Sequence, residues 1–450
     1  MMTPTTPKLI LPDIPNLHHI DVYERHNGYQ ALRKALGMKP DDVIEEVKKS
    51  NLRGRGGACF PTGLKWTFMP KSREAGSSSH PTSGTGQTSK PKYLCANGDE
   101  SEPGTFKDRQ IFEFNPHLFI EGSVIAAYAM GVKTVYVYVR GEYAKWITML
   151  QKAVDDAYAK NYIGSKILGS GFSTEVYIYK GAGAYICGEE SALMNSIEGD
   201  RGYPRVRPPF PAQFGLWGCP TTINNIETLA NVPVIITMGW EAYAKIGAPK
   251  QPGTLLYGVS GHVNKPGVYE LPTGVLLTDL IYKYAGGVPG NKKIKAVIPG
   301  GSSTMWLRGE EIEGVKMDAD SLKAVGTSIG TAGVIVMDED TDVLKVLARI
   351  THFYHHESCG QCTPCREGCG WMEKILNRFL VGEGTMRDVE LLLDVANNIE
   401  GNTICALGDA AAWPIQSFIR KFRDEFERRA KKAPAEKKYV PPPHLVTLEA

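Results

Sequence analysis

The sequence contains no apolar run that approaches the roughly 20 residues of a membrane-spanning helix. It also lacks a secretory signal, because the segment from Met1 to Asn16 is rich in Pro and Thr and has no apolar core. No sign of charge dominates, since 51 Lys and Arg stand against 49 Asp and Glu and the net charge is +2. Binding of nucleic acid through a basic patch is therefore not expected. The first two absences predict an intracellular protein that meets a membrane only indirectly, through partners.

The cysteine content points to metal binding. The chain has 450 residues, enough for about three domains, and nine cysteines. Without a secretory signal, these thiols are expected in a reducing compartment and are available as metal ligands rather than as disulfides.

Three of the cysteines recur at every third position. Cys359, Cys362 and Cys365 lie on a short stretch rich in Gly and Pro, a spacing that lets one loop direct three thiolates at a single [4Fe–4S] cluster. The fourth ligand has two candidates. Cys369 completes a C-x2-C-x2-C-x3-C run, but the last cysteine of that run usually ligates a second cluster. Cys405 follows in a Gly-flanked turn between two predicted helices, and a helical hairpin would return it to the first three. We predict Cys405.

A structural zinc site is the alternative use of four thiolates. Zinc sites usually consist of separated C-x2–4-C pairs rather than three cysteines within seven residues, so an iron–sulfur cluster is favoured. His352, His355 and His356 lie nearby and are predicted to be packing or surface residues rather than ligands.

Residues 52–66 form a glycine-rich stretch. Gly54, Gly56 and Gly57 allow backbone amides to approach an anion closely. The stretch follows a predicted helix rather than the strand of a Rossmann fingerprint, and Cys59 stands where a third glycine would be. A plain surface loop is therefore an equally good interpretation.

The next part of the chain alternates strands and helices. Strands are predicted at 92–96, 134–139 and 174–179, with helices at 118–130 and 143–160 between them. This alternation predicts βαβ units and a largely parallel sheet.

Carboxylates follow two of these strands. Asp99, Glu100 and Glu102 follow the first, and Glu189 and Glu190 follow the third. Open α/β sheets bind ligands beyond the carboxyl ends of their strands. An ordinary acidic turn and helix-dipole partners remain open.

Two later segments carry further binding groups. Phe210 belongs to a stiff proline-rich segment that presents an aromatic face, and Asn224 and Asn225 offer amide groups on a predicted loop.

The secondary-structure pattern of the remaining chain changes twice. Short strands at 255–259, 267–270, 295–298 and 334–337, with a helix at 276–285, predict a small β-grasp domain.

From residue 342 the pattern is helical. Helices are predicted at 371–380 and 389–399, and an apolar stripe from Ile415 to Phe426 adds another, with Pro414 in its first turn. The predicted domains are residues 1–250 (α/β), 251–338 (β-grasp), 339–432 (all-α bundle carrying the cluster) and 433–450 (tail). The Ser/Gly/Thr/Pro-rich tract at 71–92 is not expected to join a core.

Five motifs occur in this order: GRGGACFPTGLKW, NGDESEPGTFKDR, GAYICGEESAL, PTTINNIET and ESCGQCTPCREG. Together, over about residues 20–430, they resemble the family of FMN- and NADH-binding 51 kDa (F) subunits of respiratory NADH:quinone oxidoreductase, complex I. The resemblance implies a Rossmann-like FMN domain, a ubiquitin-like domain and a four-helix bundle with a [4Fe–4S] cluster. It implies an NADH dehydrogenase in which hydride passes directly to FMN, single electrons pass to the cluster, and no residue acts as a catalytic acid or base.

The resemblance also assigns residues to each cofactor. For FMN they are Gly54, Gly56, Lys65, Asn97, Asp99, Glu100, Ser101, Tyr185, Gly188, Glu189, Asn224, Asn225 and Thr228. For NADH they are Gly57, Ala58, Phe60, Lys65, Phe68, Glu102, Tyr185, Glu190 and Phe210. For the cluster they are Cys359, Cys362, Cys365 and Cys405. Two departures from the family are Cys59, in place of a glycine, and the tract around 77–89, an insertion.

The implied partners are a thioredoxin-like [2Fe–2S] subunit and a large iron–sulfur subunit. The implied location is cytoplasmic and peripheral, on the inner face of the cell membrane within a complex. The diaphorase subunit of an NAD-linked hydrogenase or formate dehydrogenase is the alternative enzyme, and a zinc-stabilised scaffold without activity is the alternative of another class. Glu190 is expected to set the preference for NADH over NADPH.

Overall fold

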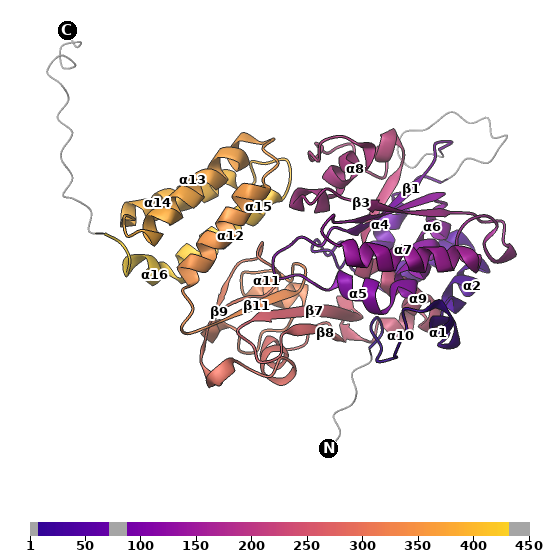
Figure 1. Ribbon diagram of the computed structural model, residues 1–450, viewed down its shortest axis with the longest axis horizontal. Coiled ribbons are helices and arrows are strands. Elements are labelled where there is room, and N and C mark those ends of the chain that lie inside the picture. Colours follow the sequence, from indigo (N-terminus) through magenta and orange to yellow (C-terminus); the bar gives the residue numbers. More distant parts are fainter. Residues whose placement is uncertain (1–7, 72–87, 432–450) are drawn as a thin grey trace, which may run out of the picture.

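The computed structural model describes residues 8–71 and 88–431 (Figure 1). Most of the Ser/Gly/Thr/Pro tract and the tail from 433 lie outside the described residues. Three units follow one another along the chain: an α/β unit, a second unit built on a mixed sheet, and a set of C-terminal helices.

Four helices form the N-terminal part. They are α1 (Ile20–Arg25), α2 (Gln30–Leu36), α3 (Pro40–Lys49) and α4 (Thr62–Thr67). Asp41 and Asp42 do not cap α3, because Pro40 already occupies the first helical position. Both acids lie in the first turn, where they complement the helix dipole.

The first sheet is fully parallel. Its strands are β1 (Tyr93–Gly98), β2 (Thr134–Val139), β3 (Glu175–Lys180) and β4 (Thr221–Asn225), in the order β3-β2-β1-β4. The sequence predicts β1, β2 and β3. The loop predicted for Asn224 and Asn225 is wrong, because both residues end β4 and pair with β1.

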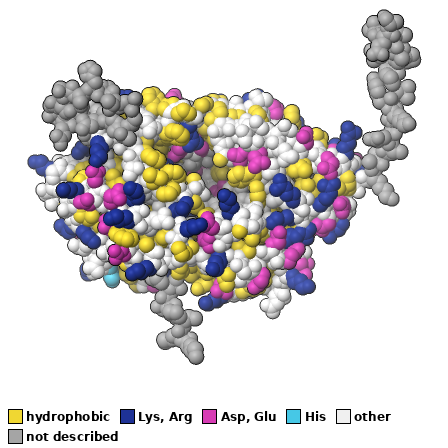
Figure 2. Space-filling view, turned by 180° about the vertical axis from the view of Figure 1, so that it is seen from behind, with side chains coloured by type: hydrophobic (Ala, Val, Ile, Leu, Met, Phe, Trp, Pro, Cys, Tyr) yellow, Lys and Arg dark blue, Asp and Glu magenta, His cyan; other side chains and the backbone are white. Residues whose placement is uncertain are grey.

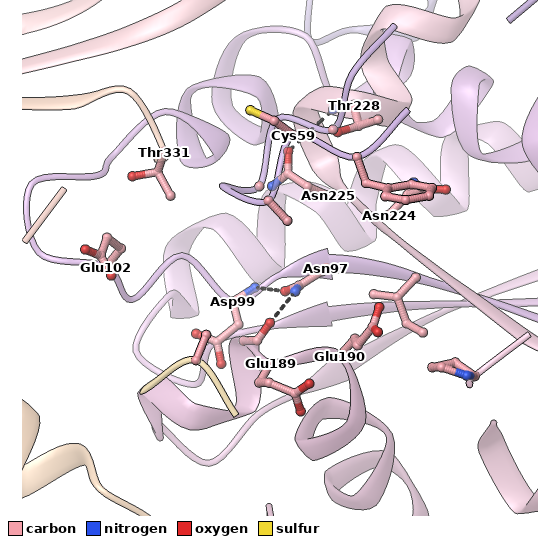
Figure 3. Close-up of a pocket in the computed structure, with 18 of the residues that line it drawn as sticks. Cys59, Asn97, Asp99, Glu102, Glu189, Glu190, Asn224, Asn225, Thr228 and Thr331 are labelled. Carbon is pink, nitrogen blue, oxygen red and sulfur yellow. Dashed lines mark hydrogen bonds between the residues drawn. The ribbon is translucent and has the colours of Figure 1, made fainter. Parts of the chain in front are cut away.

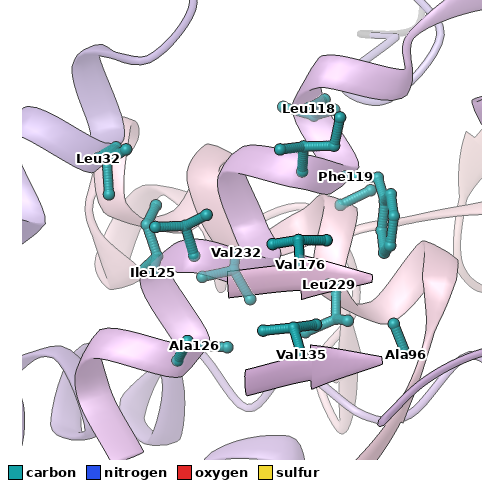
Figure 4. Close-up of a cluster of buried hydrophobic side chains, with 14 of the residues drawn as sticks. Leu32, Ala96, Leu118, Phe119, Ile125, Ala126, Val135, Val176, Leu229 and Val232 are labelled. Atoms are coloured by element: carbon teal, nitrogen blue, oxygen red, sulfur yellow. The ribbon is translucent and has the colours of Figure 1, made fainter. Parts of the chain in front are cut away.

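Helices cover this sheet unequally. They are α5 (Asp108–Phe114), α6 (Pro116–Met130), α7 (Ala144–Ala159), α8 (Glu190–Glu198), α9 (Ile226–Met238) and α10 (Trp240–Tyr243). Alternate strand residues such as Val135 and Val176 pack with α6, α7 and α9 in one core (Figure 4). The opposite face, through Cys95 and Tyr138, packs against α8.

The second unit is a five-stranded mixed sheet. Its strands are β7 (Thr254–Gly261), β8 (Gly267–Pro272), β9 (Ile294–Ile298), β10 (Leu307–Arg308) and β11 (Gly333–Asp338), in the order β10-β9-β11-β7-β8. β7 and β8 form an antiparallel hairpin, and β11 returns parallel to β7. The predicted helix at 276–285 is a shorter π-helical segment, Asp279–Tyr284. Small elements complete the unit: β5 (Gly247–Ala248), β6 (Gln251–Pro252) and α11 (Ala319–Ala324).

The C-terminal helices pack in a ring. They are α12 (Val343–Glu357), α13 (Thr363–Leu380), α14 (Met386–Ile399) and α15 (Leu407–Lys421), followed by α16 (Arg423–Glu427). The predicted stripe, from Ile415 to Phe426, is buried in their core. Pro414 does not begin a helix but lies inside α15.

The surface carries mixed charge. Lys and Arg side chains are interspersed with Asp and Glu on the face shown in Figure 2. Within residues 8–71 and 88–431, we find no helix long and apolar enough to cross a membrane.

Candidate functional site

A cavity of about 920 Å3 opens beyond the carboxyl ends of β1 and β4 (Figure 3). All three units contribute to its wall: Asn97 and Asn225 come from the parallel sheet, Thr331 from the second unit and Ala406 from the turn before α15. Its size falls within the roughly 300–1,000 Å3 of small-molecule and cofactor sites.

The cavity gathers nearly all of the nucleotide residues predicted from sequence. Those that line it are Gly54, Gly56, Ala58, Phe60, Lys65, Phe68, Asn97, Asp99, Glu100, Ser101, Glu102, Tyr185, Gly188, Glu189, Glu190, Phe210, Asn224, Asn225 and Thr228. Gly57 is outside the lining set. The structure adds Arg207, Ser303 and Trp413, which sequence reasoning missed.

The glycine-rich loop forms one wall because it packs closely on β4. A Cβ atom on Gly56 would lie 3.0 Å from Cβ of Asn225, and the amide of Arg55 donates to Oγ1 of Thr228 at 2.8 Å. Cys59 has φ of 52°, a left-handed conformation that glycine adopts at less cost. The loop therefore keeps a glycine-like backbone around the cysteine.

The turn after β1 forms a second wall. Asn97 donates its side-chain amide to O of Gly188 at 2.8 Å and accepts from the amide of Asp99 at 3.0 Å. Ser101 donates to Asp99. Burial raises the pKa of Asp99 to about 7, although the Ser101 hydrogen bond opposes the shift.

Glu102 joins all three units. Its carboxylate accepts from the Tyr185 hydroxyl at 2.7 Å, from the Ser303 amide at 2.7 Å and from the Ser302 hydroxyl at 3.2 Å. Ser302 also hydrogen-bonds the hydroxyl of Tyr354 on α12 at 2.8 Å. Burial raises the pKa of Glu102, and these donors offset part of that shift.

The paired acids at the start of α8 have different partners. Glu189 caps the helix by accepting from the amides of Ser191 and Ala192, both at 2.9 Å, so the helix-dipole interpretation accounts for part of its role. Glu190 instead meets two cations, Lys65 at 3.0 Å and Arg207 at 2.6 Å. The only sequence signal for Arg207 was a cation directly before the rigid segment that carries Phe210.

A cluster of buried charged residues packs against the cavity wall. Lys107 pairs with Asp108 at 2.9 Å and with Glu227 of α9 at 2.7 Å, and all three side chains are almost fully buried. Asp108 in turn accepts from the side-chain amide of Asn225 at 2.7 Å. These acids raise the pKa of Lys107 despite its burial, so the ammonium stays charged.

The cysteines lie at one end of the ring of helices. Cys359 and Cys362 are in the loop between α12 and α13, Cys365 is in the first turn of α13, and Cys405 is in the turn between α14 and α15. The predicted hairpin therefore exists, and the Ile404 amide next to Cys405 donates to Sγ of Cys362 at 3.3 Å. An N–H aimed at this sulfur suits a thiolate ligand of an iron–sulfur cluster.

The competing cysteine has a different environment. Cys369 is fully buried one turn further along α13, with its Sγ 3.9 Å from Sγ of Cys365. Across residues 8–71 and 88–431, no three His, Cys, Asp or Glu side chains are grouped as for a single metal ion. The ligand set therefore remains a prediction.

The nearby histidines lie on the surface, in agreement with the sequence interpretation. His352 and His355 contact Glu373, and His356 contacts Glu357.

Comparisons with known proteins agree with this geometry. Residues 47–234 match the family of Nuo51 FMN-binding domains, residues 255–346 the SLBB domain, and residues 345–429 the NADH-ubiquinone oxidoreductase-F iron–sulfur binding region. The NADH-quinone oxidoreductase F subunit of Rickettsia typhi is 54% identical over 91% of this chain and 93% of its own length. The F 2 subunit of the same enzyme in Rhizobium meliloti is 51% identical over 92% and 95%. The chain belongs to the family of NADH-quinone oxidoreductase F subunits.

A solved structure has the same fold. The chain matches a crystal structure of NAD+-reducing [NiFe]-hydrogenase in the H2-reduced state with a TM-score of 0.80 and 33% identity. The match covers 90% of this chain and 65% of that one, so this F-family chain spans just under two thirds of the hydrogenase chain.

Membership of the family confirms the predicted cofactor classes. The F-family chain binds FMN and a [4Fe–4S] cluster and oxidises NADH, and the zinc alternative is not supported. The iron–sulfur match includes all four predicted cysteines and also Cys369.

Proposed function

We propose that this chain is the electron-input subunit of an NADH:quinone oxidoreductase and that the cavity beyond β1 and β4 is its FMN and NADH site. The cavity carries the proposal, because it collects the glycine-rich loop, the acidic turn after β1 and the start of α8 around one space. FMN supplies the chemistry, since it accepts two electrons with the hydride and releases them singly to the cluster.

The side chains of this F-family chain would bind and orient FMN and the nucleotide. Amides of the glycine-rich loop and the side chains of Asn224 and Asn225 would hold FMN, and Phe60, Phe68 and Phe210, which are exposed at the cavity, would stack on the nucleotide. Cys359, Cys362, Cys365 and Cys405 are the proposed cluster ligands, and Ala406 and Leu407 of the cavity wall directly follow Cys405. The proposed ligand Cys405 is therefore adjacent in sequence to the cavity wall.

The finer architecture is part of the proposal. The proposed divisions are a Rossmann-like FMN domain to residue 250, a ubiquitin-like β-grasp domain at 251–338 and a four-helix bundle from 339, with 1–7, 72–87 and 432–450 outside the described residues. The hairpin β7-β8 with β11 parallel to β7, and the ring of α12 to α15, support these assignments.

The proposed partners are a thioredoxin-like [2Fe–2S] subunit and a large iron–sulfur subunit. Together they would hold the chain on the cytoplasmic face of the cell membrane. Co-purification under gentle conditions tests this proposal, and recovery of neither partner would contradict it.

The alternative is the diaphorase subunit of an NAD-linked hydrogenase, favoured by the structural match at 33% identity. The higher identities to the F subunits, 54% and 51%, favour the first function. Transfer of electrons from NADH to a quinone by the purified assembly would support the role in NADH:quinone oxidoreductase. Reduction of NAD+ by hydrogen would support the alternative.

The activity itself is tested on the isolated chain. We expect flavin and iron–sulfur absorbance, and NADH-dependent reduction of a soluble artificial acceptor. A Cys362→Ser variant should retain FMN and this activity, because the flavin cavity belongs mainly to another unit. Loss of the activity with FMN still bound would show that the acceptor is reduced through the cluster.

A further inference from the structure

One carboxylate connects the cavity wall directly to the cysteine loop. Glu357 is the last residue of α12 and lies two residues before Cys359. Its Oε2 accepts from the backbone amide of Tyr185 at 3.0 Å, although the two residues are 172 positions apart in the chain. The Glu357 side chain is only 18% exposed, so this contact is shielded from solvent.

Tyr185 is held from several sides, and most of its partners come from α12. Its amide opens the 3-10 turn Tyr185–Gly188 and has no partner within that turn. Its ring meets the rings of Phe353 and Tyr354, with centroids 5.1 and 6.2 Å away. Its hydroxyl donates to Glu102. The same residue lines the cavity.

The other end of Glu357 continues into the cysteine loop. Ser358 follows it, accepts from the Gly360 amide at 3.3 Å and lies 3.2 Å from Sγ of Cys365. A displacement of Glu357 therefore moves both the loop that carries Cys359 and the contact to Cys365.

We propose that Glu357 is a positioning residue that fixes the cysteine loop against the flavin wall at Tyr185. This proposal rests on the proposed function. With both cofactors bound, each electron leaving reduced FMN would reduce the oxidised cluster by one electron, and the rate would depend on how this chain holds the two groups. Aromatic packing of Tyr185 on α12 brings the units together, and the Glu357 hydrogen bond sets their register.

The test compares Glu357→Gln, Glu357→Asp and Glu357→Ala in the complete, cofactor-loaded chain. Gln keeps an acceptor oxygen at the same reach, Asp keeps the charge but shortens the side chain, and Ala removes both. The matched control is Glu367→Ala, because Glu367 is a half-exposed carboxylate close to the same cysteines whose ion-pair partner is Arg366, beside it in the sequence.

Stopped-flow bleaching of the flavin by NADH measures the hydride step, and freeze-quench EPR measures arrival of electrons at the cluster. We expect Ala and Asp to slow cluster reduction several-fold, since electron transfer slows when donor and acceptor are held less closely. Gln should recover most of the rate. Flavin bleaching, KM for NADH and iron content should stay at wild-type values, and the Tyr185 amide should exchange hydrogen faster in Ala and Asp.

Cluster reduction at the wild-type rate in all three variants would overturn the proposal, as would an equal loss in Glu367→Ala. If Ala fails to load the cluster, the contrast between Gln and Asp decides, because equal rates in those two variants also overturn it. Absence of flavin bleaching by NADH in the wild type would instead refute the proposed function.

Discussion

Glu190 shows how much a single side chain depends on its neighbours. It begins α8, and two cations, Lys65 and Arg207, hold its carboxylate at the cavity. A carboxylate in this position can accept from a ribose 2′-hydroxyl and repel a 2′-phosphate. The ordinary alternative, a partner for the helix dipole, is worth only about 0.3–1 kcal/mol.

Glu190→Gln and Glu190→Ala should narrow the preference for NADH over NADPH. Loss of one charge-assisted hydrogen bond costs about 1.5–3 kcal/mol, which corresponds to roughly 10- to 150-fold in the ratio of kcat/KM values. Steady-state kinetics with NADH and NADPH measure this ratio, and the distant Glu241→Gln variant serves as control. If the ratio of kcat/KM for NADH to that for NADPH stays within about threefold of wild type, Glu190 serves only the helix dipole, and Glu102 becomes the candidate for the discriminating carboxylate.

Asp99 should make the stability of the flavin-free protein depend on pH. Its pKa is about 7 in the folded chain, against 3.8 as a reference for the unfolded chain. The folded state therefore binds the proton more tightly, and stability falls as pH rises from about 4 to about 7, by a few kcal/mol at most. Asp99→Asn should remove this part of the slope. Thermal midpoints of both proteins between pH 5 and 8 measure it, and parallel curves would contradict the prediction.

The fourth cluster ligand can be decided by two substitutions. Cys405 lies in the turn beside Cys362, whereas Cys369 is fully buried on α13. Cys405→Ala should abolish the EPR signal of the reduced [4Fe–4S] cluster, and Cys369→Ala should retain it. FMN should remain in both proteins, since its cavity is lined mainly by other elements. The opposite EPR result would make Cys369 the ligand.

At the scale of elements, buried charge links α5 to α9. Lys107 is the cation between Asp108 and Glu227, and Glu227 also accepts from the Leu256 amide of β7 at 3.0 Å. These buried charged residues therefore connect the α/β unit to the mixed sheet next to the cavity.

Lys107→Met should destabilise the chain by about 3–5 kcal/mol, because it leaves buried carboxylates without their cation. Adding Glu227→Gln should restore part of the loss. Lys145→Met removes an exposed partner of Glu113 and should cost about 1 kcal/mol or less. Denaturant midpoints measure all three, and equal effects of Lys107→Met and Lys145→Met would exclude the buried-pair argument.

The periodicity of apolar residues predicts most of the helices and strands, but not a strand that depends on its pairing with a neighbouring strand. The apolar alternation of β2 and the stripe on α15 are visible in the sequence because each has one buried face. The strand β4 was missed because Thr221–Asn225 is short and polar at its end, and only its pairing with β1 makes it a strand. Pro414 was misplaced because α15 begins at Leu407, directly after the cysteine turn.

Site residues that belong to a sequence motif could be predicted from the sequence. Contacts between segments that are distant in the sequence could not. Lys65 and Glu190 were both named from motifs, but their ion pair joins segments 125 positions apart. Arg207 and Ser303 belong to no motif and enter the cavity only through the fold. Nor does the sequence show that Cys59 retains a positive φ.

At the scale of the whole molecule, the beginning of the chain fastens the first two units together. Glu270 of β8 accepts from the amides of Leu9, Ile10 and Leu11 at 2.7–3.1 Å. Asn115, before α6, donates to O of Ile10 at 2.8 Å. The segment thus binds the mixed sheet and the α/β unit at once.

Glu270→Ala should lower the thermal midpoint and speed hydrogen exchange at residues 9–11. Each lost hydrogen bond to a charged acceptor is worth about 1.5–3 kcal/mol. Exposed Glu313→Ala on the same unit serves as control. Wild-type exchange at these amides in the Glu270 variant would show that the segment is held by other contacts.

The shared wall of the cavity has a consequence for how the protein matures. Because Asn97, Thr331 and Ala406 come from three successive units, the binding site is complete only after the last helices have docked. A nascent chain would therefore offer flavin the α/β wall first and would add the contacts of Ala406, Leu407 and Trp413 only after its C-terminal part is synthesised. Slower loss of flavin from the complete chain than from a chain without its last helices would therefore report that these helices have docked.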